Sequence, residues 1–208
     1  MNKKVVVIGC GNVGMSYAYA LLNQRTYVNE LVLIDINKEK ATGEVMDLNH
    51  SLAFAPSKIN IKVGEYSDCR DAKIVVIAAG ANQEVGETRM DLIHKNNAVF
   101  KDVVTKVCES GFNGIYLIAT NPVDVMSYIT WKCAKCPTSK VIGTGTTLDT
   151  ARLRYEVASR LNISPKNIHA YVIGEHGDTE FVPWSNANVA LQNITDFLDS
   201  NTLEEICN

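Results

Sequence analysis

Short apolar runs alternate along the chain with longer segments of helical spacing, and this alternation is the feature that most constrains the fold. The runs are β-branched and uninterrupted, which is typical of strands buried on both faces of a parallel sheet. Because parallel strands are joined by right-handed crossovers, the order predicts a doubly wound parallel α/β sheet with helices on both faces. The runs are residues 5–8, 31–34, 74–79, 115–119 and 141–142, and the helical segments are residues 13–23, 38–48, 88–108 and 123–133.

The pattern changes after Gly143. A long helix is expected over residues 148–161, followed by strand-like runs at 168–173 and 179–184. We therefore predict two domains, with the parallel sheet in residues 1–143 and the first part of an incomplete α+β domain in residues 144–208.

The end of the chain carries a helix-start pattern. Thr202-Leu203-Glu204-Glu205 has the spacing of a capping box, in which a hydroxyl and a carboxylate satisfy the first N–H groups of a helix. A helix that began there would stop at Asn208 after about a turn and a half, which is marginal by itself. The sequence therefore predicts a chain that has been cut.

Composition and charge narrow the classes of partner. With 46% hydrophobic and 21% charged residues, the chain can bury a sizeable core and lacks the signature of disorder. The net charge of -3 with scattered lysines and arginines gives no footprint for nucleic acid or an anionic membrane, so a small-molecule ligand is expected. No stretch reaches the ~20 apolar residues of a membrane span, and glycines interrupt the N-terminal run that imitates a secretion signal.

The six cysteines are too dispersed for a disulfide framework, which predicts a reducing, cytoplasmic compartment. Cys133 and Cys136 form one CxxC pair. Without a second pair or a nearby histidine, we interpret them as two thiols near a helix end, with a metal or redox role as the alternative. No metal is expected.

A glycine-rich turn follows the first apolar run. The segment Gly9-Cys10-Gly11-Asn12-Val13-Gly14 fits GxGxxG, in which the first glycine allows the turn, the second admits a pyrophosphate and the third packs helix on strand. Asp35 ends the second run at the position expected for a carboxylate that binds the adenosine ribose. Together they predict an NAD site on a Rossmann sheet, since the carboxylate would repel the 2′-phosphate of NADP; a structural glycine turn is the alternative.

Beyond this fingerprint, four further segments follow along the chain: residues 79–89 (AGANQEVGETR), 119–124 (ATNPVD), 148–152 (LDTAR) and 174–178 (GEHGD). In these segments and their order the chain resembles bacterial L-lactate dehydrogenases of the lactate/malate dehydrogenase superfamily. The resemblance implies reversible hydride transfer between L-lactate and NAD, giving pyruvate and NADH at the fermentative end of glycolysis, in a homotetramer.

His176 is the candidate catalytic base. Oxidation of a secondary alcohol needs a base for the hydroxyl proton, and histidine titrates in the right range. The resemblance implies that Asp149 accepts from the other ring nitrogen and that Arg89 polarises the ketone. The alternatives are a satisfied histidine at a strand end and, for Arg89, a solvated arginine in the first turn of a helix.

Four residues are expected to hold the substrate together with Arg89. Asp149 and Arg152 are three apart on the expected helix and share a face, and the resemblance implies that Arg152 grips the carboxylate with its planar fork; an ordinary helix pair is the alternative. Asn121 resembles the residue that contacts nicotinamide ribose and substrate. Gln83 stands where malate dehydrogenases carry arginine, which favours pyruvate over a dicarboxylate.

The resemblance also implies further binding residues. Arg154 and His169 match positions that bind fructose 1,6-bisphosphate in allosterically activated members, and the alternative is a surface arginine with an unrelated histidine. The remaining cofactor contacts that the resemblance implies lie at Val13, Lys40, Tyr66, Gly80, Ala81, Asn121 and Thr144.

Two other functions remain open. The chain could belong to a malate or other 2-hydroxyacid dehydrogenase, which Gln83 argues against, or it could be a truncated, non-catalytic NAD-binding remnant. The family continues for roughly a further third, so residues 144–208 are expected to expose apolar faces.

Overall fold

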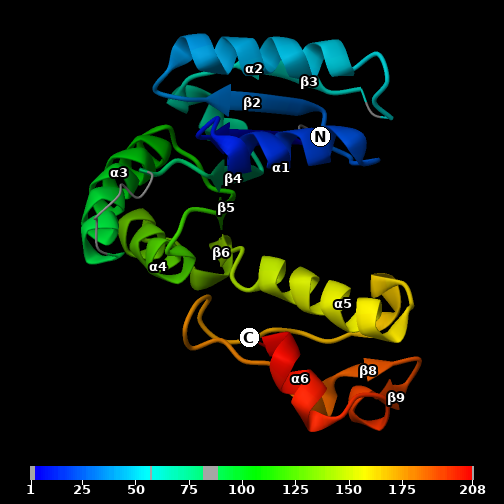
Figure 1. The fold of residues 1–208 in the computed structure, drawn as a ribbon. Coiled ribbons are helices and arrows are strands. Elements are labelled where there is room, and N and C mark those ends of the chain that lie inside the picture. The colour runs from blue at the N-terminus through cyan, green and yellow to red at the C-terminus, as the bar shows by residue number, and fades with distance from the viewer. Residues whose placement is uncertain (1–2, 57, 82–88, 208) are drawn as a thin grey trace. The chain divides into compact units, whose positions relative to one another are not determined.

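The computed structural model describes residues 3–56, 58–81 and 89–207, and for residues 89–93 it describes the backbone alone. The chain divides into two compact units, Met1–Gly143 and Thr144–Asn208. Each unit is described by itself (Figure 1).

The first unit contains a six-stranded parallel sheet, which confirms the predicted doubly wound fold (Figure 1). Its strand order is β3-β2-β1-β4-β5-β6, so the order reverses between β1 and β4, and ligands bind at the carboxyl ends of the strands beside such a point. The strands are β1 (Lys4–Ile8), β2 (Glu30–Ile34), β3 (Asn60–Val63), β4 (Ile74–Ile77), β5 (Ile115–Ile118) and β6 (Val141–Gly143).

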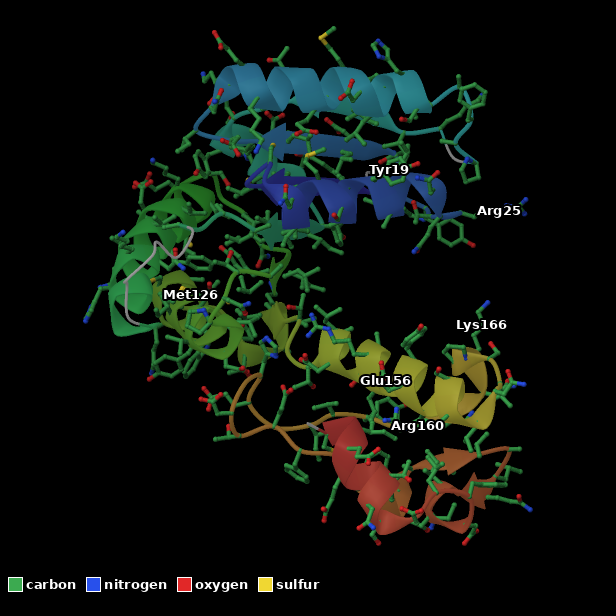
Figure 2. The ribbon with its side chains drawn as sticks, in the orientation of Figure 1. Tyr19, Arg25, Met126, Glu156, Arg160 and Lys166 are labelled. Carbon is green, nitrogen blue, oxygen red and sulfur yellow. The ribbon has the colours of Figure 1, made fainter. Side chains whose placement is uncertain are left out.

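Helices cover both faces of this sheet because successive strand residues point to opposite sides. Val5 and Val7 of β1 pack with α1 (Asn12–Asn23) and α2 (Lys38–Ser51). Val6 and Ile8 pack with α3 (Arg89–Glu109), α4 (Val123–Ala134) and the 3₁₀ helix η1 (Tyr66–Asp71). Met126 of α4 is fully buried in this second layer (Figure 2). A further 3₁₀ turn, η2 (Thr138–Lys140), precedes β6.

In the parallel sheet, the apolar runs missed β3. Ile61 is buried, whereas Asn60 before it is exposed, so β3 alternates instead of forming a continuous run. Among the described strands it stands at the end of the order, beside β2, which makes it an edge strand, and a half-solvated edge favours alternation.

A network of ion pairs joins β1, β2 and β3 to η1. Lys4 is 5% exposed, and its Nζ lies 2.5 Å from Asp71 Oδ1 and 3.8 Å from Glu30 Oε2. Lys62 Nζ lies 2.9 Å from Asp68 Oδ1 and 3.1 Å from Glu30 Oε1, and these hydrogen bonds raise the pKa of Lys62. Burial raises the pKa of the Asp68 carboxyl, but hydrogen bonds from Lys62 and a backbone N–H outweigh burial and hold that pKa below its ordinary value.

The second unit packs around α5 (Thr147–Leu161). Leu153 and Val157 of this helix form a small core with Leu203 of α6 (Ser200–Cys207). Arg160 of α5 pairs with Glu156 at 3.0 Å (Figure 2) and lies 3.9 Å from Glu205 of α6. The remaining elements are the short antiparallel strands β7 (Ile168–His169), β8 (Asn188–Val189) and β9 (Gln192–Asn193), with 3₁₀ turns η3 (Pro165–Asn167), η4 (Trp184–Asn186) and η5 (Ile194–Asp196).

The long strands expected at residues 168–173 and 179–184 are wrong. Beyond the two residues of β7, the backbone pairs with side chains of α5: Val172 N donates to Thr150 Oγ1 at 3.0 Å, and Ala170 O accepts from Arg154 Nε at 3.0 Å. Only one bridge, between Ile173 and Phe181, joins the two runs.

The capping box at Thr202 is also wrong. Helix α6 begins at Ser200, and the Asp199 carboxylate accepts from Thr202 N at 2.9 Å. Hydrogen bonds from Thr202 lower the pKa of Asp199. A carboxylate is the stronger N-cap because it also meets the positive end of the helix dipole.

Surface features of the described residues bear on two further expectations. None of the described helices combines the length and the apolar character that crossing a membrane requires, and none of the six cysteines forms a disulfide. The second unit exposes large apolar side chains, although the described residues of the first unit expose as many. Those of the second unit that are more than a third exposed are Leu148, Tyr155, Ile163, Tyr171, Ile173, Phe181, Leu191 and Phe197.

Candidate active site

The glycine-rich turn connects β1 to α1 at the carboxyl edge of the sheet. Gly9 has φ +101°, and a Cβ there would lie 2.5 Å from Ala79 N, while a Cβ at Gly14 would overlap the carbonyl oxygen of Gly9. A Cβ at Gly11, in contrast, would meet nothing within 4 Å. Packing therefore requires two of the glycines, and Gly11 leaves open space at the N-terminus of α1, where a pyrophosphate fits.

Asp35 follows β2 and contacts the glycine-rich turn through a hydrogen bond. Its Oδ2 accepts from Cys10 N at 2.7 Å and its Oδ1 accepts from Asn37 N at 2.9 Å. Each oxygen keeps a further lone pair for a ribose hydroxyl. An anionic carboxylate beside the glycine turn fits NAD and opposes the additional phosphate of NADP.

The other predicted cofactor residues of the first unit lie in the segments that leave the strands. Gly80 and Ala81 follow β4, and Asn121 follows β5. Val13, which is 56% exposed, lies in the first turn of α1. Lys40 lies in the first turn of α2 and Tyr66 begins η1, where burial raises the pKa of the Tyr66 phenol.

The structure gives no side-chain position for two of the predicted substrate residues, Gln83 and Arg89. Gln83 lies outside the described residues, and Arg89 is the first residue of α3, with its side chain outside the description. Asn121 is exposed in the loop between β5 and α4. Thr144, expected to contact the cofactor, is exposed at the start of the second unit.

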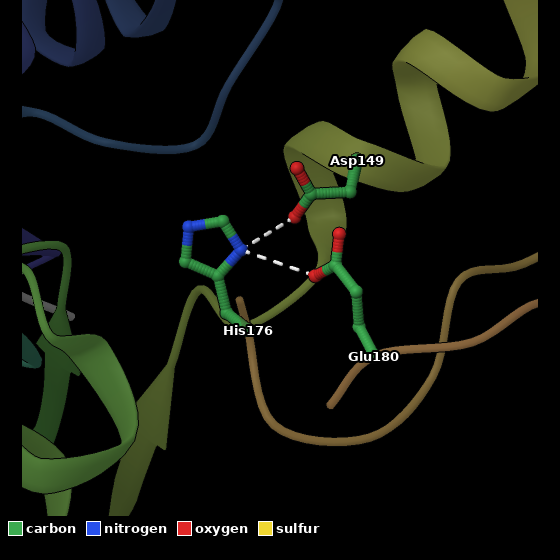
Figure 3. Close-up of side chains that lie close together, drawn as sticks. All are labelled: Asp149, His176 and Glu180. Carbon is green, nitrogen blue, oxygen red and sulfur yellow. Dashed lines mark hydrogen bonds and ion pairs between the residues drawn. The ribbon is translucent and has the colours of Figure 1, made fainter. Parts of the chain in front are cut away.

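The second unit brings three predicted residues together. His176 Nδ1 lies 2.7 Å from Asp149 Oδ2 (Figure 3), and Asp149 Oδ1 lies 3.2 Å from Arg152 NH1. Asp149 stands in the first turn of α5, where the helix dipole stabilises its charge. Its side chain is 10% exposed, whereas that of Arg152 is 66% exposed. Asp149 thus contacts both Arg152 on its own helix and His176 in the loop, and its contact with Nδ1 orients the imidazole.

The loop that carries His176 is closed at its base. Ile173 and Phe181 exchange two backbone hydrogen bonds of 2.9 Å. Within the loop, Gly174 has φ +106° and Gly177 has φ +130°, conformations that favour glycine. The glycines that flank the histidine therefore shape a tight loop that presents its ring to Asp149.

Sequence reasoning missed Glu180. Its Oε2 lies 3.3 Å from His176 Nδ1 and accepts from Gly177 N at 3.2 Å (Figure 3). Asp149 is nearer to the ring and more buried than Glu180, so its charge acts more strongly on the imidazole. The three side chains have the ligand atoms of a cation site, within 4.8 Å of one another. A proton on His176 Nδ1 would satisfy the same carboxylate oxygens of Asp149 and Glu180 in place of a cation. In the sequence, the one signal for this contact is that Glu180 follows His176 by four residues.

The two residues predicted to bind an allosteric anion, Arg154 and His169, both lie in the second unit. Arg154 donates to Ala170 O and its guanidinium lies 4.7 Å from the centre of the Tyr171 ring. His169 is exposed in β7. Arg154 thus has structural contacts of its own within the second unit.

Comparisons with known proteins agree along the whole chain. Residues 3–143 match the family model of the lactate/malate dehydrogenase NAD binding domain, and residues 146–205 match that of the lactate/malate dehydrogenase alpha/beta C-terminal domain. An L-lactate dehydrogenase of Borrelia hermsii is 53% identical over 98% of this chain and 64% of its own length. One from Oceanobacillus iheyensis is 55% identical over 98% of this chain and 64% of its own length.

Solved structures give the same result. A lactate dehydrogenase from a Medee basin deep-sea metagenome library has a TM-score of 0.93 and 57% identity, covering 99% of this chain and 67% of its own. The ligand-bound minor L-lactate dehydrogenase of Enterococcus mundtii has a TM-score of 0.95 and 44% identity, with the same coverage.

The chain spans less than two thirds of the length of the curated relatives it matches. Both domain models nevertheless match, and the first is an NAD-binding domain whose glycine turn and Asp35 fit the cofactor. NAD is therefore the cofactor, as predicted. The chain belongs to the lactate/malate dehydrogenase family.

Proposed function

We propose that the chain carries the site of an L-lactate dehydrogenase, which transfers hydride reversibly between L-lactate and NAD to give pyruvate and NADH. The observation that carries this proposal is the 2.7 Å pair between His176 Nδ1 and Asp149 Oδ2, with Arg152 on the same helix face. The names of the relatives, which are L-lactate dehydrogenases, support the same reaction.

His176 exchanges the substrate proton. Because two carboxylates flank Nδ1, this nitrogen holds the N–H of the neutral ring, and Nε2 takes the hydroxyl proton when lactate is oxidised. Asp149 fixes this tautomer and stabilises the imidazolium that results. In the reverse direction the imidazolium returns the proton to the carbonyl oxygen of pyruvate.

Arg152 binds the substrate carboxylate. Its guanidinium has five N–H donors, of which the contact with Asp149 uses one, and the side chain is largely exposed. A planar fork binds a carboxylate through two parallel hydrogen bonds, which orients the substrate as well as holding it. Asn121 contacts substrate and nicotinamide ribose, and Arg89 polarises the ketone as its negative charge develops.

Gln83 sets the choice of substrate in this proposal. A neutral amide provides no charge for a second carboxylate, so oxaloacetate would leave a carboxylate unpaired, whereas the methyl group of pyruvate needs no partner. The proposal therefore expects a preference for pyruvate.

The cofactor lies along the carboxyl edge of the first unit in this proposal. NAD, when bound, supplies the hydride acceptor at its nicotinamide. The open space at Gly11 admits the pyrophosphate, and Asp35 accepts hydrogen bonds from the adenosine ribose. Val13, Lys40, Tyr66, Gly80, Ala81 and Thr144 complete the contacts.

The cellular setting is part of the same proposal. We assign the chain to cytoplasmic pyruvate fermentation at the end of glycolysis, and six thiols without a disulfide among the described residues support a reducing compartment. We also propose a homotetramer in which Arg154 and His169 bind fructose 1,6-bisphosphate. The cationic side chain of Arg154 and the exposure of His169 support this anion site.

The test is NADH consumption by the purified chain with pyruvate, then with oxaloacetate, each with and without fructose 1,6-bisphosphate. Turnover of pyruvate by the wild type and by His50→Asn, an exposed control in the last turn of α2, but not by His176→Asn, is the expected result. Faster turnover of oxaloacetate would replace this function with that of a malate dehydrogenase. NADH binding without any turnover would identify a non-catalytic remnant.

A further inference from the structure

Asn96 is a buried amide in the middle of α3. Its side chain is 1% exposed, yet both ends of the amide are paired with backbone outside the helix. Oδ1 accepts from Ala81 N at 2.8 Å, and Nδ2 donates to Asn121 O at 3.0 Å. The amide therefore bridges two loops that are far apart in the sequence.

The two loops follow adjacent parallel strands. Ala81 follows β4 and Asn121 follows β5, and these strands pair in register from Ile74 with Ile115. Loops at the carboxyl ends of such strands have left the ladder, so their N–H and C=O groups need other partners. Asn96 supplies one partner to each loop.

Gly80 shows how closely this bridge is packed. A Cβ at Gly80 would lie 2.6 Å from Thr120 Cγ2 and 3.3 Å from Asn96 Oδ1. Thr120 in turn donates from Oγ1 to Ala79 O at 2.8 Å. The loop after β4 is thus held against both the amide and the loop after β5.

We propose that Asn96 is a positioning residue that fixes the cofactor segment Gly80–Ala81 relative to the substrate residue Asn121. This inference rests on the proposed function, which gives those segments their roles. Asparagine suits the place because the bridge needs one acceptor and one donor on a planar group. A carboxylate would keep the acceptor for Ala81 N but would set an oxygen against Asn121 O.

The first test measures the bridge without any ligand. Hydrogen exchange of the Ala81 amide is followed by NMR in the full chain and in the variants Asn96→Ala and Asn96→Asp. We expect exchange to quicken at least about tenfold in Asn96→Ala, because the N–H loses its acceptor. The aspartate should restore protection to within about threefold of the wild type. Equal exchange in all three proteins would overturn the proposal.

The second test separates the two arms of the bridge. Titration with NADH should show a Kd raised about tenfold in Asn96→Ala and within about threefold of the wild type in Asn96→Asp. The kcat/KM for pyruvate should fall at least about tenfold in Asn96→Asp, because the Asn121 arm alone is lost. Thr130→Val is the control, since it removes a buried 2.8 Å hydrogen bond to Met126 O within α4.

The outcomes distinguish this inference from the function on which it rests. Equal effects of Asn96→Ala and Thr130→Val on NADH affinity would reduce Asn96 to a stabilising residue and overturn the proposal. If Asn96→Ala does not fold, normal kcat/KM in Asn96→Asp overturns it instead. A wild-type chain that binds NADH without turning over pyruvate removes the proposed function, while the exchange and NADH titrations still decide the role of Asn96.

Discussion

The glycine turn allows one prediction in which the same substitution has different consequences at two nearby positions. Alanine at Gly9 should destabilise the first unit, whereas alanine at Gly11 should leave stability unchanged and weaken NADH binding. Both positions belong to the same fingerprint, in which the first glycine allows the turn and the second admits a pyrophosphate. The structure separates them by what surrounds the added methyl group.

At Gly9 two costs add. The residue has φ +101°, which costs a residue with a side chain about 1–3 kcal/mol. The added Cβ would also lie 2.5 Å from Ala79 N and 2.7 Å from Ala78 C, and forcing an atom into a packed site costs about 1–3 kcal/mol. The lower entropy of the unfolded variant returns about 0.4–1 kcal/mol. The net loss of about 1–6 kcal/mol is a substantial part of the roughly 5–15 kcal/mol that is typical of a folded domain.

At Gly11 the costs cancel. Its φ of -79° and ψ of -176° suit alanine, and a Cβ would meet no atom within 4 Å. Losing glycine at an N-cap costs roughly 0.5 kcal/mol, which the unfolded state returns. The methyl group would instead occupy the space proposed for the pyrophosphate. A misfit of one such group costs about 1–3 kcal/mol, or roughly 10–200-fold in NADH affinity.

The assay pairs urea unfolding, followed by circular dichroism, with NADH titration of each variant. Gly9→Ala should lower the unfolding midpoint, and Gly11→Ala should unfold like the wild type while its Kd rises. Wild-type NADH affinity in Gly11→Ala would show that the cofactor does not approach the chain at this point. Wild-type stability in Gly9→Ala would refute the steric argument.

Three further outcomes are expected. Asp149→Asn should lower kcat/KM for pyruvate by about 10–100-fold, since a charge-assisted hydrogen bond contributes about 1.5–3 kcal/mol; steady-state kinetics that match the wild type would remove Asp149 from the mechanism. Lys4→Met should cost about 1–3 kcal/mol in urea unfolding, because Asp71 loses its 2.5 Å partner, and a gain in stability would mean that desolvation of Lys4 dominates. The depressed pKa of Asp68 means that its stabilising contribution is present above its unfolded pKa, near 3.8, and is lost as pH falls through the folded pKa. The stability difference between wild type and Asp68→Asn should therefore shrink with acid, and a constant difference from neutral pH to about pH 3 would contradict this sign.

The parallel sheet was predictable because its strands carry their own signal. Strands such as β1 and β4 are buried on both faces and so appear as continuous apolar runs. The edge strand β3 has a half-solvated environment and alternates, which a search for continuous runs does not detect. The apolar residues of 168–173 were misread for a different reason. Their burial comes from packing on α5, and helix side chains satisfy their backbone.

The residues of the candidate site likewise fall into those that the sequence predicted and those that it missed. His176, Asp149 and Arg152 were predictable because their segments resemble motifs of the family, and the structure brings the three side chains together. Residue type and spacing alone would have favoured an ordinary helix pair and a satisfied histidine. Glu180 was not predictable, because its role depends on a loop that turns back on itself between Ile173 and Phe181. Periodicity carries no information about such a turn.

Asn96 was hidden by its place in a helix, although asparagine has a weak helix propensity. The loops at the carboxyl edge have left the sheet ladder, so their backbone N–H and C=O groups need other partners. The positions of these loops therefore depend on side chains that hydrogen-bond to the backbone. Asp35 accepts from Cys10 N, while Asn96 accepts from Ala81 N and donates to Asn121 O. Once a sheet edge has been identified as a site, a polar residue on the buried face of a neighbouring helix is a candidate for this role. A motif search for ligand contacts does not find it, because its partners are peptide groups and these leave no pattern in the sequence.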